Sequence, residues 1–195
     1  LGEVVAGWRV PAAGRIVLAG QDVTKRNPRG RRRLGLAHIP SDRLRRGLAP
    51  SLPLEFNAVL GRHWEKPYAR FGMLRRRAVR ELANEVADRF DVRGVRGPVG
   101  RLSGGNQQKL IVGRELHHNP SVVLACQPTR GVDIGAVEHI HRELLRRRAE
   151  GAAILLISAD LDELLSLSDR LVVLFGGQIV AAGRKDEFTE ASLGM

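Results

Sequence analysis

Apolar residues along the chain form two kinds of pattern. Short continuous runs, typical of buried strands, cover residues 15–19, 36–39, 122–125, 153–157, 171–175 and 178–182. Spacing of three to four residues, typical of amphipathic helices, covers residues 54–60, 75–90, 106–117, 136–150 and 161–167. Strands that alternate with helices of this length predict a largely parallel sheet covered by helices. The predicted fold class is α/β.

Turn and cap residues refine this pattern. Asn27 and Pro28 offer an N-cap and a first-turn proline for a short basic helix. Gly176 and Gly177 predict a tight hairpin between the last two strands. Between Pro50 and Pro98 the pattern indicates helices and no strand, which predicts a helical insert. The opening residues already have helical spacing, so we expect the sequence to begin inside an element.

The composition is strongly basic, with a net charge of +11, which raises the question of nucleic-acid binding. Arginine runs occur at residues 31–33, 75–77 and 146–148, but only 4% of the residues are aromatic. Stacking of bases on interleaved aromatic side chains is therefore not indicated. Solvated helix faces explain the runs, and we expect no nucleic-acid partner.

The cysteine and histidine residues give little sign of redox or metal chemistry. Cys126 is the only cysteine, which excludes an internal disulfide, and its place at a buried strand end predicts an inert core thiol. His117 and His118 are adjacent, while His139 and His141 do not share a helix face. We expect no transition-metal site.

The longest apolar runs are far shorter than the ~20 residues of a membrane helix, so any membrane role should come through a partner.

The stretch LSGGNQQKL, residues 102–110, has the residues of an anion site. Ser103 can cap a helix, and Gly104 and Gly105 let the backbone approach a ligand. The first-turn N–H groups and the helix dipole would then face an anion. Taken alone, the same stretch is more typical of a capped helix after a flexible loop than of an anion site.

The motifs that follow change this balance. Three further segments follow LSGGNQQKL and form an ordered series with it. They are VVLACQPTRGVD, a strand that ends in ILLISADLDE, and a strand pair with a Gly-Gly turn. This series resembles the nucleotide-binding domain of ABC transporters. It is most similar to the second of two fused domains in the ATPase subunit of simple-sugar and nucleoside importers, which carry LSGGNQQK and PTRGVDIGA. These motifs stand here at Leu102–Lys109 and Pro128–Ala136, and the resemblance runs from IPSDR, which begins at Ile39, to the final hairpin.

The resemblance implies a fold and a division of the chain. We expect a P-loop NTPase-like ABC ATPase domain that is incomplete at its N-terminus, with residues 1–51 and 101–195 forming the ATPase core. Residues 52–100 would form a helical subdomain. No P-loop string G-x-x-x-x-G-K-S/T is present; in the family it lies just upstream and is often degenerate in the second domain. Without that segment, a central sheet position should be unfilled.

Further departures from the family pattern fall on the catalytic positions. The family's Asp-Glu pair after the central strand corresponds to Cys126 and Gln127, its switch histidine to Ala159, and its loop glutamine to Ser41. A thiol is a poor ligand for Mg²⁺, and an amide cannot accept a proton from water. The resemblance therefore implies that this chain alone does not hydrolyse ATP, although it would be part of an ATPase.

The intact signature implies a role toward a partner domain. In the family, two domains face head to tail, so the signature of one completes the ATP site of the other. The residues implied here are Leu102, Ser103, Gly104, Gly105, Asn106 and Gln107, with ATP and Mg²⁺ bound mainly by the partner. For Gln107, Gln108 and Lys109, a binding role and a solvated position both stay open. Asp133 resembles a domain-contact residue, with an ordinary helix cap as the alternative.

The expected partners follow from the same resemblance. They are the first nucleotide-binding domain of the same subunit or a second copy, and the transmembrane permease subunits through the helical subdomain. A periplasmic or lipoprotein substrate-binding protein would act indirectly, at the cytoplasmic face of a bacterial membrane. Arg75–Arg77 and Arg80 could contact lipid headgroups or acidic partner residues, although solvation is favoured.

The transported substrate stays open between simple sugars and nucleosides, with Cys-Gln-Pro-Thr and Ser-Ala-Asp favouring the nucleoside branch. A non-transport ABC-type domain that acts on nucleic acid or translation is the alternative function.

Overall fold

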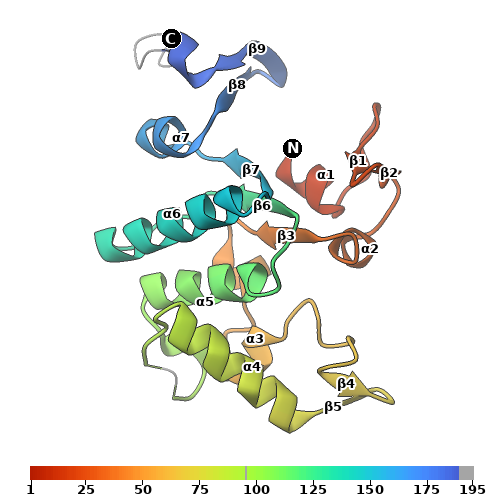
Figure 1. Ribbon diagram of the computed structural model, residues 1–195, viewed down its shortest axis with the longest axis vertical. Helices are drawn as coiled ribbons and strands as arrows, with labels where there is room; N and C mark the ends of the chain where they lie inside the picture. The colour runs from red at the N-terminus through yellow and green to blue at the C-terminus, as the bar shows by residue number, and fades with distance from the viewer. Residues whose placement is uncertain (95, 189–195) are drawn as a thin grey trace.

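A three-stranded parallel sheet forms the centre of the molecule in the computed structural model, which describes residues 1–94 and 96–188. Its strands are β3 (Leu36–Ile39), β6 (Val122–Cys126) and β7 (Ala153–Ile157), in the order β3-β6-β7 (Figure 1). Leu36 pairs with Val122, which pairs with Ala153. The predicted α/β class with parallel strands is confirmed.

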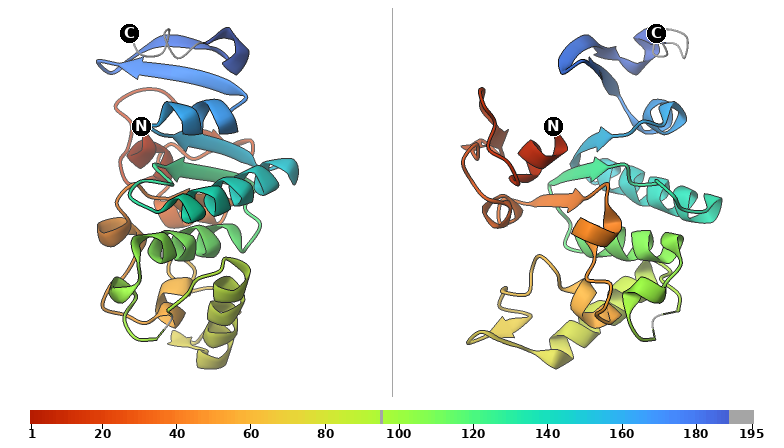
Figure 2. Two further views of the ribbon diagram at one scale, coloured as in Figure 1. Left: turned by 90° about the vertical axis from the view of Figure 1, so that its left-hand side faces the viewer. Right: turned by 180° about the vertical axis from the view of Figure 1, so that it is seen from behind.

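Helices cover both faces of this sheet (Figure 2). α5 (Gly104–Leu116) and α6 (Ile134–Ala149) pack on one face, where they bury most of the apolar core. The other face is covered by α1 (Gly2–Ala6), the hairpin of β1 (Val17–Leu18) and β2 (Gln21–Asp22), and α2 (Pro28–Arg32). Two apolar clusters thus fix the sheet from opposite sides.

Asn27 caps α2, as predicted: its Oδ1 accepts from the Gly30 amide.

The insert follows a π-helical turn, η1 (Arg43–Gly47), and is mainly helical. It contains α3 (Leu54–Ala58), α4 (Arg76–Arg89) and a 3₁₀ turn, η2 (Val99–Arg101). It also contains an antiparallel pair, β4 (Ala69–Arg70) and β5 (Met73–Leu74), so the prediction of no strand between Pro50 and Pro98 is wrong. Each of these strands is two residues long and mostly exposed, which leaves no alternation of apolar and polar residues to recognise.

The last elements are α7 (Leu161–Leu167), β8 (Arg170–Phe175), β9 (Gln178–Arg184) and a 3₁₀ turn, η3 (Lys185–Glu187). β8 and β9 pair with each other, and within the described ranges they form no ladder with β7 (Figure 1). The groove between β7 and β8 has a volume of about 720 Å³ and is lined by Ile154, Leu156, Val172 and Leu174 among others. Within the described residues, β7 and β8 lie on opposite sides of this groove and are not hydrogen-bonded to each other.

Helix boundaries differ slightly from those predicted. α5 begins at Gly104 rather than at Asn106, because Ser103 is its N-cap. α6 begins at Ile134 rather than at Ala136, because Asp133 caps it. None of the helices in the described residues combines the length and the apolar character that a membrane span needs.

Candidate functional site

The carboxyl ends of the three parallel strands bring the four predicted degenerate positions to one edge of the sheet. Ser41 lies two residues beyond β3, Gln127 one residue beyond β6, and Ala159 two residues beyond β7. The Gln127 amide donates to the Ile157 carbonyl at 2.7 Å, which ties the ends of β6 and β7 together. In open parallel sheets this edge is where ligands bind.

The end of β6 offers no carboxylate. Cys126 is buried, and burial raises the pKa of its thiol, as expected for an inert core residue. Gln127 has a positive φ of 50°, a left-handed conformation that typically costs ~1–3 kcal/mol for a residue with a side chain. Because Mg²⁺ prefers hard oxygen ligands, the Cys126 thiol does not fit that ion, and the Gln127 amide cannot accept a proton from water.

Ser103 begins the signature helix in a geometry that leaves its hydroxyl proton free to donate. Its Oγ accepts hydrogen bonds from the backbone amide of Asn106 at 3.3 Å and from Asn106 Nδ2 at 2.9 Å. Asn106 Oδ1 in turn accepts from the amide of Arg93 at 2.8 Å. Since a serine hydroxyl has one donor and two acceptor sites, these contacts use acceptor sites and keep the O–H available for an anion.

Gly104 and Gly105 pack against the loop between β6 and α6, within the chain. A Cβ at Gly104 would lie 2.9 Å from Arg43 Nη2 and 3.0 Å from the Gly131 carbonyl oxygen. A Cβ at Gly105 would overlap Asp133 Oδ2 and lie 3.2 Å from Ala136 Cβ. From the sequence, both glycines are expected to let the backbone approach a ligand. The structure gives a second reason for them, which is close packing of this loop on the helix N-terminus.

Gln107 and Gln108 are buried, so the solvated alternative is wrong for these two, whereas Lys109 is only partly buried. Gln107 and Gln108 are 6% and 2% exposed. Gln107 Nε2 donates to the Leu102 carbonyl at 3.1 Å and so holds the loop before the helix. Lys109 Nζ lies 3.0 Å from Asp91 Oδ2. The run LIVGREL that follows has no continuous polar face, and this was the available signal that α5 is buried on several sides.

Asp133 acts as the predicted helix cap. Its Oδ1 accepts from the Ala136 amide at 2.9 Å. Its other carboxylate oxygen faces Gly105, as described above. The cap interpretation is therefore confirmed, and the role in contact with another domain stays a prediction.

A buried acidic residue that the sequence analysis missed supports the Pro-Thr turn. Glu163 on α7 is 3% exposed. Its Oε1 accepts from Thr129 Oγ1 at 2.8 Å and lies 3.0 Å from His141 Nε2 on α6. The turn after β6 is thus attached to two helices. No local pattern marks Glu163, because its partners are distant in sequence.

Arg43 is a second residue that the sequence analysis missed. Its Nη1 donates to the Arg130 carbonyl at 2.9 Å and its Nη2 to the Gly131 carbonyl at 3.3 Å. Its Nε donates to Gln107 Oε1 at 3.3 Å. Arg43 stands in the quoted motif IPSDR, but arginine is so frequent in this chain that nothing set this one apart as a contact residue.

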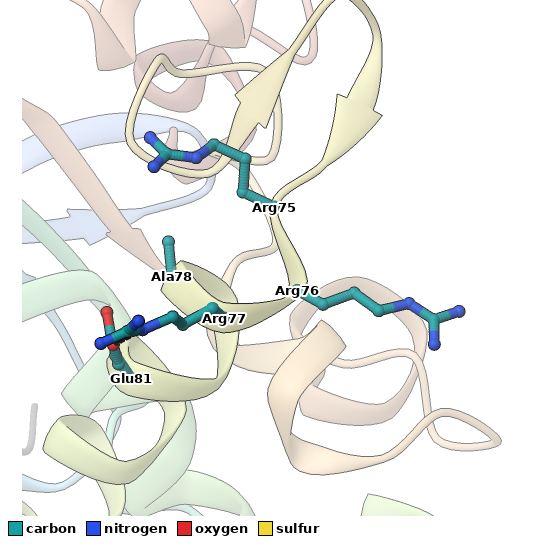
Figure 3. A pocket seen from close by; sticks show the side chains of 5 residues that line it. All are labelled: Arg75, Arg76, Arg77, Ala78 and Glu81. Carbon is teal, nitrogen blue, oxygen red and sulfur yellow. Dashed lines mark hydrogen bonds and ion pairs between the residues drawn. The ribbon is translucent and has the colours of Figure 1, made fainter.

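The arginines at the start of α4 do not form a convergent anion site. They line a shallow pocket of about 450 Å³, in which Arg75 and Arg76 point away from each other (Figure 3). Arg77 pairs with Glu81 at 2.9 Å, and its side chain is 92% exposed. These side chains are exposed in the structure, and the choice between solvent and a lipid or partner contact stays a prediction.

Several curated proteins are similar to this chain, although no family model matches it. Guanosine import ATP-binding protein NupO of Bacillus subtilis is 40% identical over 195 residues, and nucleoside import ATP-binding protein NupA of Lactococcus lactis is 38% identical over 195 residues. Ribose import ATP-binding protein RbsA 2 of Rubrobacter xylanophilus is 38% identical over 192 residues. These alignments cover 97–99% of this chain. The chain spans 37–38% of the length of these relatives.

Solved structures show which fold this is. A nucleotide-free ATP-binding cassette from an ABC transporter superposes with a TM-score of 0.76 at 23% identity, covering 100% of this chain and 78% of that one. A dimeric ATP-binding cassette in a post-hydrolysis state with ADP and Pi superposes with a TM-score of 0.77 at 18% identity, covering 94% and 78%. The chain has the fold of an ATP-binding cassette.

Proposed function

We propose that this chain is the C-terminal nucleotide-binding domain of an ABC importer ATPase subunit and that it supplies its signature to ATP bound by a partner domain. The single observation that carries this proposal is the contrast between two sites. The N-terminus of α5, which Ser103 caps, has donors that can face an anion, whereas the strand ends carry Cys126, Gln127, Ala159 and Ser41. The signature side of an ATP site thus keeps its donors for an anion, whereas the catalytic side lacks its carboxylates.

The proposed contribution is electrostatic. The Ser103 hydroxyl and the backbone N–H groups of Gly104–Asn106 would face the γ-phosphate, with the positive end of the α5 dipole behind them. Such preorganised donors stabilise charge that develops during phosphoryl transfer. Leu102 and Gln107 would support this turn from within the chain, and Asp133 would lie beside the contact with the partner domain.

Catalysis is assigned to the partner domain. This chain lacks a P-loop string and has no carboxylate at Cys126 or Gln127, so it should be inactive alone. ATP and Mg²⁺ would be held mainly by the partner, which we propose to be the first nucleotide-binding domain of the same subunit or a second copy. We propose residues 1–51 and 101–195 as the ATPase core and residues 52–100 as the helical subdomain.

The physiological setting is proposed from the relatives. The names of these relatives describe import of guanosine, nucleosides, ribose and glucose, which supports uptake of nucleosides or simple sugars. The helical subdomain would contact transmembrane permease subunits at the cytoplasmic face of the membrane, and a periplasmic or lipoprotein substrate-binding protein would act indirectly.

The test compares two variants in an assembly that contains this chain and a catalytically competent partner domain. Ser103→Arg should reduce steady-state phosphate release by ~10²–10³, the usual effect of losing one preorganised donor, because the larger side chain also blocks the phosphate. Gln127→Ala should leave turnover nearly unchanged. If Gln127→Ala abolishes turnover and Ser103→Arg does not, the assignment of roles to the two halves is wrong.

A further inference from the structure

We infer that Arg43 is a positioning residue that sets the signature turn and the Pro-Thr-Arg-Gly-Val-Asp loop (residues 128–133) in one fixed geometry. The inference rests on the proposed function, since it matters for turnover only if the signature acts on a partner's ATP. It assigns a role to a side chain to which the motifs by themselves gave none.

The contacts of Arg43 link three segments that are distant in the sequence. Two guanidinium nitrogens donate to consecutive carbonyls in the loop, at Arg130 and Gly131, and the third donates to Gln107 on α5. Gln107 in turn links Arg43 to the signature turn, because its Nε2 donates to the Leu102 carbonyl just before Ser103. The planar guanidinium presents its donors in a fixed fork, so these contacts define both the distance and the angle between the loop and the helix.

Close packing makes this geometry sensitive to the loss of Arg43. Arg43 Nη2 lies 2.9 Å from the position of a Cβ at Gly104, so the guanidinium sits beside the first turn of α5. The loop contacts the same turn through Gly131 and Asp133. Without the bridge, two loop carbonyls lose a charged donor and the loop is held on one side only. Hydrogen bonds to charged groups are among the stronger ones in proteins.

Arg45 provides a matched control from the same π-helical turn. Its side chain is 88% exposed, and its Nε lies 3.9 Å from Asp42 Oδ2. Replacing Arg45 therefore removes the same charge from the same short segment without removing a bridge. Any effect of Arg43 that Arg45 does not share cannot come from net charge.

The first measurement needs no nucleotide. Amide hydrogen exchange in residues 128–136 is compared among the parent, Arg43→Met, Arg43→Lys and Arg45→Met, each in the assembly with a competent partner domain. Arg43→Met should speed exchange in this segment by on the order of 10-fold, while Arg45→Met leaves it unchanged. Arg43→Lys should resemble Arg43→Met, because one ammonium cannot span three acceptors. Unchanged exchange in Arg43→Met would overturn the inference.

The second measurement is steady-state phosphate release as a function of ATP concentration. A misplaced signature should lower kcat by on the order of 10-fold to 100-fold and leave KM for ATP nearly constant, because the partner domain binds most of the nucleotide. A purely electrostatic role for Arg43 would instead make Arg43→Lys behave as the parent, which would overturn the bridging assignment. A rise in KM without a loss in kcat would overturn it too.

Failure of the proposed function would look different from failure of this inference. If Ser103→Arg leaves turnover unchanged, the signature does not act on the partner's ATP, and the proposed function fails whatever Arg43 does. If Ser103→Arg lowers turnover while Arg43→Met leaves kcat unchanged, the proposed function stands and the positioning role of Arg43 is wrong.

Discussion

At the scale of single residues, the signature glycines have a role that is internal to the chain. Gly105 on α5 and Gly135 on α6 both occupy the second position of a helix that begins one residue earlier. Only Gly105 faces an obstacle, since its Cβ would overlap Asp133 Oδ2. The requirement for glycine therefore arises from packing at one of the two positions and not from the helix itself.

Alanine at these two positions should have opposite effects. Gly105→Ala should reduce the free energy of unfolding by ~1–3 kcal/mol, as overpacking usually does. Gly135→Ala should be neutral or stabilising by up to ~1 kcal/mol, because its Cβ would lie 3.5 Å from the nearest atom, Asp133 Oδ1, and alanine favours helices. Urea unfolding of the two variants beside the parent tests this. Equal effects at both sites would refute the packing explanation.

At the scale of elements, the edge of β7 that faces β8 has no strand partner within the described residues. β7 pairs with β6 on one side, and the apolar groove beside β8 exposes Val172 and Leu174, which are 58% and 51% exposed. Unpaired strand edges with apolar surroundings tend to associate with other chains. Self-association through this groove is therefore expected when the chain is studied by itself.

The isolated chain should elute from size-exclusion chromatography as aggregates. Val172→Lys, which places a charge in the groove, should shift material toward the monomer. Val180→Lys on β9 is the control, because Val180 is 57% exposed but does not line the groove. A stable monomeric parent, or equal rescue by both lysines, would contradict this prediction.

At the scale of the whole molecule, a buried ionic network connects three elements. Glu115 on α5 pairs with Arg32 at 2.6 Å and with Arg114 at 3.1 Å, and it accepts from the amide of His38 on β3 at 3.1 Å. Burial favours the neutral acid, but the two arginines and these hydrogen bonds outweigh it and lower the pKa of Glu115 to about 2. Burial lowers the pKa of His38, and also that of His118, to about 4.

These pKa values predict a loss of stability in acid in two steps. Unfolded histidines take up protons near pH 6.5, whereas His38 and His118 stay neutral in the folded state until about pH 4. The unfolded state therefore binds more protons, and stability falls as the pH drops from 6.5 to 4. Glu115 adds a further loss between pH 4.5 and 2.

Urea unfolding at low protein concentration, followed by circular dichroism from pH 7.5 to 4, should reveal this slope. His38→Gln should reduce the dependence of the unfolding free energy on pH, since glutamine does not titrate. A midpoint that is constant over this range in the parent would show that the two histidines are not protected from protonation as the structure indicates.

Local interactions explain what could be predicted from the sequence. Strand and helix positions were predicted closely, and the caps at Asn27, Ser103 and Asp133 form as expected, because each depends on residues within one turn. Cys126 is buried because β6 is the central strand of the sheet, which its apolar run already indicated. The motif order also predicted the fold of an ATP-binding cassette.

Only the tertiary structure decided how these pieces meet. The burial of Gln107, the bridge from Arg43 and the pairing of Glu163 with Thr129 each join segments that lie tens of residues apart. Such contacts leave no periodic signal, because a side chain that donates to a distant carbonyl is chosen by the geometry of the packed elements and not by its neighbours in the sequence. The sequence by itself determined which elements form and which residue caps α5, while packing determined which side chains hold the N-terminus of α5 in place.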